Sequence, residues 1–515
     1  MDRATPVVTR IAGALTIATA AFLGWAAIAI DLDYYDTYDL IVSSWHLWGE
    51  PNTISYPKNF FAVAFFALLF APFRFAGAYP DLIVYHGATF LLHLALLVVT
   101  ALWIRRRLPT LPLTILIGVI AWNRLFIHFA PFAMPDLASA LAVALWFWDT
   151  EREKEIRWRQ LILRALILAF CALGRPQVAL IPIVSLIVGV VRPPQGTRLR
   201  AARNAAAASF GGLALYALAT GTLLALEKGV DFFSGLVEVV RILIGYWDAV
   251  HASSQPPLIV FSFIWESLTP AGVVLIAIGA VEFLRRRPTL PVAGPFVGGL
   301  VFLGFLFVPG YVEARYLIPL LPIFALAQGF GLASLHRVRP VAAVLAALVL
   351  FAGVVPEMAR LTDPFYRSDH HGKTARAIAT KNPAAPVTLL GTMHAFYPRE
   401  RNFHEQDTTF YIYDFGAPAQ IFYTRQKISI HWGRMTFRRY GLPIPDDVES
   451  IAAPGVTMVL VKTWLYPGKE APNEILPIYA LRWFPRDPAT NGTCDPRATH
   501  ICVETWIPFQ GTLPP

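Results

Sequence analysis

The sequence contains few charged residues and few cysteines. Only 15% of its 515 residues are Asp, Glu, Lys or Arg, whereas 56% are hydrophobic, and the mean hydropathy is +0.52. A soluble protein of this length cannot bury that much apolar surface in its core, so much of the surface must face lipid. Three Cys residues provide little basis for a disulfide framework. The composition therefore predicts a polytopic integral membrane protein.

Acidic residues are fewer than basic ones, 34 against 43, which gives a formal net charge of +9. An excess of basic residues is also found in nucleic-acid-binding proteins. Here, however, the basic residues lie in short clusters between apolar runs, as the positive-inside rule requires. The charge pattern therefore indicates membrane topology, and no nucleic-acid partner is predicted.

The apolar runs predict about eleven transmembrane helices. Arg3 and Arg10 precede the first run and place the N-terminus in the cytoplasm, and clusters such as Arg105-Arg106-Arg107 and Arg285-Arg286-Arg287 mark further cytoplasmic ends. The first run has no convincing signal-peptide cleavage site, so we expect it to be retained as an anchor. The predicted spans are 11–30, 82–104, 111–127, 135–148, 161–173, 178–191, 205–226, 258–283, 291–307, 316–335 and 341–355.

An odd number of spans places the C-terminus outside the cell. We therefore expect a transmembrane domain over 1–358 and a soluble extracytoplasmic domain over 359–515, of α/β or α+β type, with short strands at 387–390, 420–423 and 457–461. The first external loop, 31–81, contains the apolar segment 60–75, which includes Pro72 and Arg74. The next span, 82–104, must end in the cytoplasm and therefore begin outside, so segment 60–75 cannot itself cross the membrane. We predict that it is a juxtamembrane helix at the outer interface.

The first external loop begins with an acid-rich stretch, Asp31-Leu32-Asp33-Tyr34-Tyr35-Asp36-Thr37-Tyr38-Asp39. Carboxylates are unfavourable in hydrocarbon, so these must lie in water or in a polar cavity at the membrane face. Asp33 and Asp36 share a face if the segment is helical. A carboxylate near apolar surroundings has a raised pKa and suits the role of general base toward a hydroxyl or amine. The alternative interpretation is a solvated loop end.

Two further segments carry candidate site residues at predicted outer ends of spans. Asp136 follows Pro135 at the start of a span, where it is either functional or simply a favourable charge at a helix N-terminus. Arg315 begins an apolar run that contains two prolines, as is common where a span lines a cavity. Its guanidinium could grip a phosphate with two hydrogen bonds. The alternatives for Arg315 are snorkelling and pairing with Glu313.

Taken together, these segments resemble the GT-C superfamily of membrane glycosyltransferases, and most of all the protein mannosyltransferase and lipid A aminoarabinose transferase group. The resemblance covers about residues 11–355 and depends on the order of short motifs along the chain. After the first span and the acids come Trp48-Gly49, Tyr56-Pro57-Lys58, Asp136, Gly174-Arg175-Pro176, Gln255-Pro256-Pro257-Leu258 and Arg315-Tyr316-Leu317-Ile318-Pro319-Leu320-Leu321-Pro322.

The resemblance implies roles for these residues. Asp36 or Asp33 would be the catalytic base, and Asp136 a second carboxylate that shapes the acceptor site. Lys58, Arg315 and Arg175 would contact the phosphate of a lipid donor, with Tyr56, Glu313 and Tyr316 as further candidate site residues. The sequence departs from the family pattern in two ways: an adjacent acid pair such as Asp-Glu is absent, and Lys58 follows a single Pro. No metal-ligand set is predicted, and the acids are compatible with the divalent cation that some relatives require.

The resemblance thus implies an inner-membrane glycosyltransferase of the cell envelope. It would move a hexose or pentose from a polyprenyl-phosphate carrier to an extracytoplasmic lipid, glycan or protein acceptor. A glycine-rich nucleotide-binding motif is absent from the sequence, which argues against a soluble nucleotide-sugar donor. One alternative is a non-catalytic polyprenyl-lipid-binding or polymer-assembly protein, for which Asp33 and Asp36 would be dispensable. Another is a secondary transporter, but the apolar runs form no inverted repeat and the acids cluster at one face.

Overall fold

The computed structural model describes most of the first 362 residues and five short strands beyond them. The described ranges are 4–30, 35–48, 59–77, 80, 82–134, 136–151, 158–191, 198–251, 258–285, 290–308, 314–362, 387–390, 403–404, 421–424, 461–464 and 502–505. The chain divides into two compact units. Unit 1 comprises 1–30, 58–64 and 83–363, and unit 2 comprises 31–57, 65–82 and 364–515.

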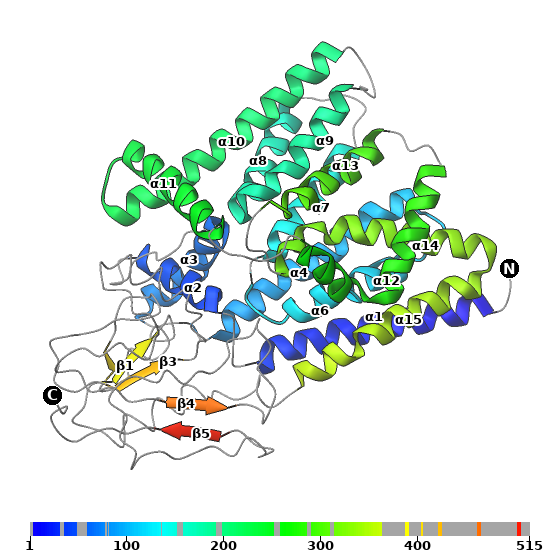
Figure 1. Cartoon of the computed structure of the whole chain (residues 1–515), viewed down its shortest axis with the longest axis horizontal. Coiled ribbons are helices and arrows are strands. Elements are labelled where there is room, and N and C mark those ends of the chain that lie inside the picture. The colour runs from blue at the N-terminus through cyan, green and yellow to red at the C-terminus, as the bar shows by residue number, and fades with distance from the viewer. Residues whose placement is uncertain are drawn as a thin grey trace. The chain divides into compact units, whose positions relative to one another are not determined.

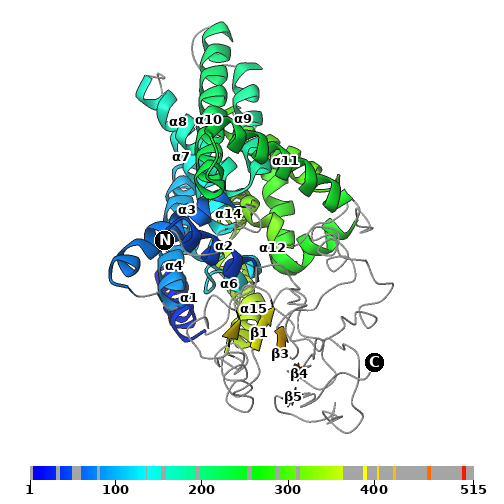
Figure 2. The same ribbon diagram turned by 90° about the vertical axis from the view of Figure 1, so that its left-hand side faces the viewer.

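Unit 1 is a bundle of helices (Figure 1). Its most extensive contacts join α12 to α14, α10 to α8 and α11, and α13 to α9, while α1 lies beside α15 and α5 (Figures 1 and 2). The helices are α1 (Ala4–Ala29), α4 (Leu82–Arg107), α5 (Leu113–Ala121), α6 (Arg124–Phe129), α7 (Asp136–Glu151), α8 (Trp158–Gly174), η1 (Pro176–Ala179), α9 (Leu180–Val191), α10 (Arg198–Lys228), α11 (Phe232–His251), α12 (Ile259–Arg285), α13 (Leu290–Phe305), η2 (Ala314–Leu320), α14 (Leu321–Val338) and α15 (Pro340–Leu361).

Six helical segments among the described residues are long and apolar enough to cross a membrane, so the chain is a multi-pass membrane protein. Shorter apolar helices occur at Phe60–Phe75, Pro176–Val191 and Phe296–Phe305. The predicted total of about eleven spans therefore stays a prediction. The six candidate spans are Arg10–Ala29, Ile83–Arg107, Arg198–Leu226, Ser267–Arg285, Ala314–Val338 and Pro340–Ala359.

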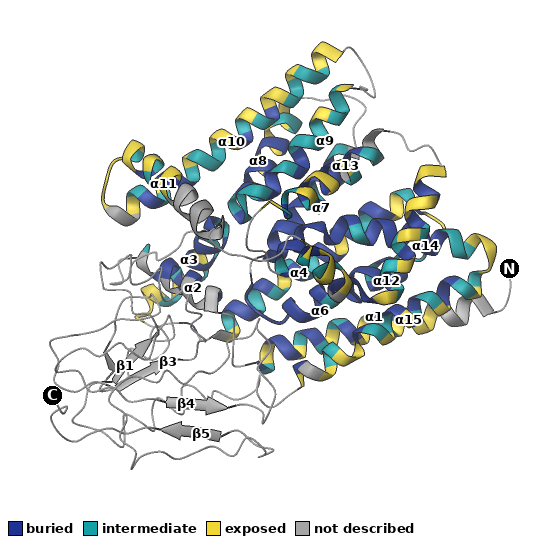
Figure 3. Ribbon diagram, in the orientation of Figure 1, coloured by how far each residue is buried: buried dark blue, intermediate teal, exposed yellow. Residues whose placement is uncertain are grey.

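The span Ala314–Val338, which includes α14, lies at the centre of unit 1. The protein buries 89% of this span, compared with 22% of the span in α10, whose outer surface is left for lipid (Figure 3). Close packing against α12 explains the difference. A Cβ atom at Gly279 would clash with the backbone of Ala327, and one at Gly331 would clash with the backbone of Leu275. Glycine at these two positions lets the helix backbones touch, as small residues do in membrane bundles.

Two of the predicted spans are interrupted. The run expected as one span at 111–127 is two helices, α5 and α6, because the Asn123 side chain accepts a hydrogen bond of 3.0 Å from the Leu125 N–H and caps α6. In α12, Thr269 has φ 57° and ψ 154°, and its Oγ1 accepts a hydrogen bond of 3.2 Å from the Gly272 N–H. Pro270 follows Thr269, so the second half of α12 begins with an N-cap and a proline.

Helix α11 was not anticipated from the sequence. It turns back along α10, where a Cβ atom at Gly235 would clash with the Gly221 carbonyl oxygen. Asp231 caps its first turn by accepting hydrogen bonds from the Phe233 and Ser234 N–H groups, at 2.9 and 3.1 Å. The Ser234 hydroxyl also donates to Asp231, and this contact holds the pKa of the carboxyl below its usual range.

Unit 2 contains α2 (Tyr35–His46), most of α3 (Phe60–Phe75) and the strands. The bounds of α3 are those predicted from the sequence, and the Trp48 indole donates a hydrogen bond of 2.9 Å to the Ala67 carbonyl of this helix. Strand β1 lies where the sequence predicts it, whereas β4 overlaps its predicted range by one residue. The strands are β1 (Val387–Leu390), β2 (Phe403–His404), β3 (Ile421–Thr424), β4 (Val461–Trp464) and β5 (Cys502–Thr505).

The five strands form two small sheets. Strands β2, β1 and β3 pair in that order and run parallel, with Val387 opposite Ile421, whereas β4 and β5 are antiparallel. Parallel and antiparallel pairing therefore both occur after α15. Whether 359–515 forms a separate extracytoplasmic domain stays a prediction.

Candidate functional site

Asp136 and Arg175 form a buried ion pair where α7 begins and α8 ends. Asp136 is the first residue of α7, and Arg175 directly follows Gly174, the last residue of α8. The Arg175 Nε donates to Asp136 Oδ1, and the two side chains are 17% and 4% exposed. The helices can approach this closely because position 174 is glycine: a Cβ atom there would clash with Ser139 Oγ, one turn along α7 from Asp136.

The 3-10 helix η2, which begins at Ala314, contributes to the same place. It packs against α7, and the Tyr316 ring lies beneath the Arg175 guanidinium, with 4.2 Å between Cζ and the ring centroid. This is a cation–π contact. Arg315 directly precedes Tyr316 in η2. We refer to Asp136, Arg175, Arg315 and Tyr316 as the arginine cluster.

The arginine cluster is suited to an anion. It contains the guanidinium groups of Arg175 and Arg315, the carboxylate of Asp136 and the ring of Tyr316. Arg175 uses Nε for Asp136 and one face for Tyr316, while its Nη1 and Nη2 form no hydrogen bond in the described part of the chain. Paired N–H groups of arginine match two oxygens of a phosphate or carboxylate.

Three segments that are separate in the sequence therefore come together in the arginine cluster. Asp136 and Arg175 are 39 residues apart, and Arg315 comes much later in the sequence. The opposite end of the α7–α8 pair carries a second buried ion pair, in which the Arg164 Nε donates to Asp149 Oδ2 at 3.1 Å. The two helices are thus joined by an Asp–Arg pair at each end.

The other predicted site residues lie in unit 2 or outside the described part of the chain. Asp36 lies in the first turn of α2, in unit 2. Asp39 lies in the same helix. Four of the predicted residues fall outside the described part of the chain: Asp33, Tyr56, Lys58 and Glu313.

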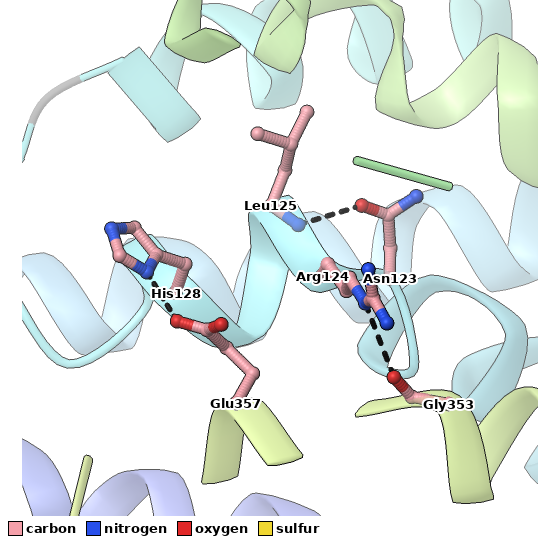
Figure 4. A network of polar contacts seen from close by, with 6 residues as sticks. All are labelled: Asn123, Arg124, Leu125, His128, Gly353 and Glu357. Carbon is pink, nitrogen blue, oxygen red and sulfur yellow. Dashed lines mark hydrogen bonds and ion pairs between the residues drawn. The ribbon is translucent and has the colours of Figure 1, made fainter. Parts of the chain in front are cut away.

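Sequence analysis missed a polar contact between α6 and α15. His128 and Glu357 are 229 residues apart and form a short hydrogen bond between Nδ1 and a carboxylate oxygen, as Figure 4 shows. One turn away, the Arg124 Nε donates to the Gly353 carbonyl at 3.2 Å. A single histidine after an apolar run does not indicate which residue it will contact. The pairing with Glu357 depends on how α6 and α15 pack in the folded protein.

The residues described do not assemble a metal site. Within these parts of the chain, no three His, Cys, Asp or Glu side chains lie close enough to hold an ion together.

The sequence matches no family model and no curated protein. The fold resembles the oligosaccharyltransferase of Archaeoglobus fulgidus, in its apo form and in a complex with zinc and sulfate, at 12% identity and TM-scores of 0.46 and 0.41. These matches cover 81% and 84% of this chain but only 62% and 61% of the oligosaccharyltransferase. It also resembles ArnT of Cupriavidus metallidurans bound to undecaprenyl phosphate, at 13% identity and a TM-score of 0.48, over 76% of this chain and 86% of ArnT.

At these identities and TM-scores the likeness concerns the arrangement of helices and transfers no substrate or residue role to this chain.

Proposed function

We propose that this protein is a glycosyltransferase that moves one sugar from a polyprenyl-phosphate carrier to an extracytoplasmic acceptor. The observation that carries the proposal is the arginine cluster, in which Arg175 pairs with Asp136 and lies over Tyr316, the residue that follows Arg315, at the ends of apolar segments. A lipid-linked phosphate needs this combination of positive charge and adjoining apolar surface. The sugar, the acceptor and the location in the inner membrane, with the cluster facing outward, are part of the proposal.

Positive charge at the phosphate promotes transfer because the phosphate is the leaving group. In the proposed reaction an acceptor oxygen or nitrogen attacks the anomeric carbon and forms the new glycosidic bond. The bond from that carbon to the phosphate oxygen breaks, and its electron pair stays on the phosphate. Arg175, Arg315 and Lys58 would stabilise this developing charge. An in-line displacement of this kind inverts the anomeric centre.

The proton released by the acceptor requires a base. We assign it to Asp36 or Asp33 of the acid-rich stretch, and the helical position of Asp36 supports the first of these. A carboxylate beside an apolar helix has a raised pKa and can take a proton from a hydroxyl or amine. Asp136 was also a candidate catalytic carboxylate, but its contact with Arg175 suggests a different role, which is developed below.

Transfer of radiolabelled sugar tests the proposal. Purified protein is given a panel of polyprenyl-phosphate sugars with a membrane extract as acceptor. We expect wild type to transfer one sugar, and replacement of the base, Asp36→Asn or Asp33→Asn, to lower kcat by about 10²–10⁴-fold. Asp39→Asn, in the same helix as Asp36, is the matched control and should stay close to wild type.

The alternative functions predict other outcomes in the same experiment. A protein that consumes no donor but binds the carrier lipid, and loses that binding in Arg315→Ala, would be a lipid-binding or polymer-assembly protein. Transfer that persists in both Asp33→Asn and Asp36→Asn would contradict the proposed base and leave the donor class standing.

A further inference from the structure

We infer that Asp136 is a positioning residue: it holds Arg175 by Nε so that Nη1 and Nη2 together bind two oxygens of the carrier's phosphate. The inference deepens the proposed function and rests on it for the identity of the lipid. It also replaces the role of acceptor-site carboxylate that the family resemblance implied for Asp136.

The geometry of the ion pair supports this assignment. Asp136 binds Nε, the nitrogen through which the guanidinium group is attached to the rest of the side chain. The terminal nitrogens Nη1 and Nη2 hydrogen-bond no described residue and can bind a ligand. Tyr316 lies 4.2 Å from Cζ and supports one face of the guanidinium, which restricts rotation of its plane. An arginine held at Nε and at one face presents its Nη pair in a fixed direction.

The paired terminal nitrogens of Arg175 select an anionic ligand. Nη1 and Nη2 of one guanidinium group match two oxygens of a phosphate. A ligand without these oxygens cannot form the two charge-assisted hydrogen bonds. The inference therefore predicts that affinity depends on the phosphate more than on the isoprenoid chain.

The pair at the opposite end of the same helices provides an internal comparison. Arg164 and Asp149 also join Nε to a carboxylate oxygen, and both side chains are largely buried, at 6% and 12% exposure. Arg164 has further contacts of its own, whereas no described residue other than Asp136 hydrogen-bonds the Arg175 guanidinium. Both pairs tie α7 to α8, so variants of the second pair are the control for the loss of that tie alone.

Binding of radiolabelled undecaprenyl phosphate to the full chain in phosphatidylcholine nanodiscs tests the inference. We expect Asp136→Ala and Arg175→Lys each to weaken binding about tenfold or more, since lysine keeps the charge but not the paired donors. Asp136→Asn keeps an oxygen for Nε and should stay within about threefold of wild type. The controls Asp149→Ala and Arg164→Lys should bind as wild type does.

Two further arms identify the ligand group and the role. Undecaprenol, which lacks the phosphate, should bind weakly and equally to wild type and Asp136→Ala, while inorganic phosphate should compete with the labelled lipid. Melting temperatures of the Asp136 and Asp149 variants measure how much stability is lost when each ion pair between α7 and α8 is removed. The inference is overturned if wild type does not bind the lipid, if Asp136→Ala and Asp149→Ala weaken binding equally, or if Asp136→Asn binds as poorly as Asp136→Ala. Lipid that binds in the expected pattern without any sugar transfer would refute the proposed function alone.

Discussion

Single residues in this protein were visible in the sequence as candidates, but their partners were not. Asp136, Arg175, Arg315 and Tyr316 were all singled out by charge or motif, and the structure brings them together. The number of residues between them in the chain does not indicate how far apart their side chains lie in space. Gly174 illustrates the limit, because the sequence shows a glycine before Arg175, while its packing against Ser139 depends on the approach of two helices.

Gly279→Ala should destabilise the protein by about 1–3 kcal/mol, because the added methyl would clash with the backbone of Ala327, which cannot move away as a side chain can. Thermal unfolding in detergent, compared with wild type, measures the change. Gly189→Ala is the matched control: nothing lies within 4 Å of its Cβ position, so it should be neutral or gain up to about 1 kcal/mol in helix propensity. Equal melting temperatures for the two variants would contradict the close packing of α12 and α14.

At the scale of elements, apolar composition predicted where most helices lie, and local polar signals explain where it failed. The run 111–127 is interrupted at Asn123, and α12 at Thr269, each a capping residue inside an apolar stretch. Asn123 and Thr269 are visible in the sequence as possible capping residues. The apolar residues around them nevertheless led to the prediction of uninterrupted spans. Helix α11 contains Glu238, Arg241 and Asp248. These charged residues lower the hydropathy of the segment, so no span was predicted there.

The contact between α6 and α15 should be energetically coupled. His128→Leu and Glu357→Leu should each lower the free energy of unfolding by about 2 kcal/mol, because each removes a charge-assisted contact from a largely buried polar partner. The double variant should lose clearly less than the sum of the two. Chemical unfolding in detergent gives the four values of this cycle.

A second cycle on Glu282 and Arg337 is the control for the first. Glu282 is buried but Arg337 is 52% exposed, so solvent screens this ion pair and its coupling should stay below about 1 kcal/mol. Additive losses for His128 and Glu357 would show that their short contact adds nothing to stability.

At the scale of the whole molecule, the arrangement of basic residues predicts the orientation in the membrane. In a background without cysteine, Val230→Cys, in the turn between α10 and α11, should react with an impermeant maleimide added to intact cells. Arg107→Cys, at the end of α4, should react only after the membrane is permeabilised. The reverse pattern would place the arginine cluster in the cytoplasm and would remove the basis for an extracytoplasmic acceptor.

The sequence by itself determined the membrane class, the helical character, the approximate bounds of most helices and the residue types available for chemistry, because hydropathy and charge act locally along the chain. Tertiary structure decided which of those residues meet. The pairing of Asp136 with Arg175, the support from Tyr316 and the contact of His128 with Glu357 each join residues on different helices. Such contacts depend on how closely helix backbones approach, and that distance is set by packing between segments far apart in the chain.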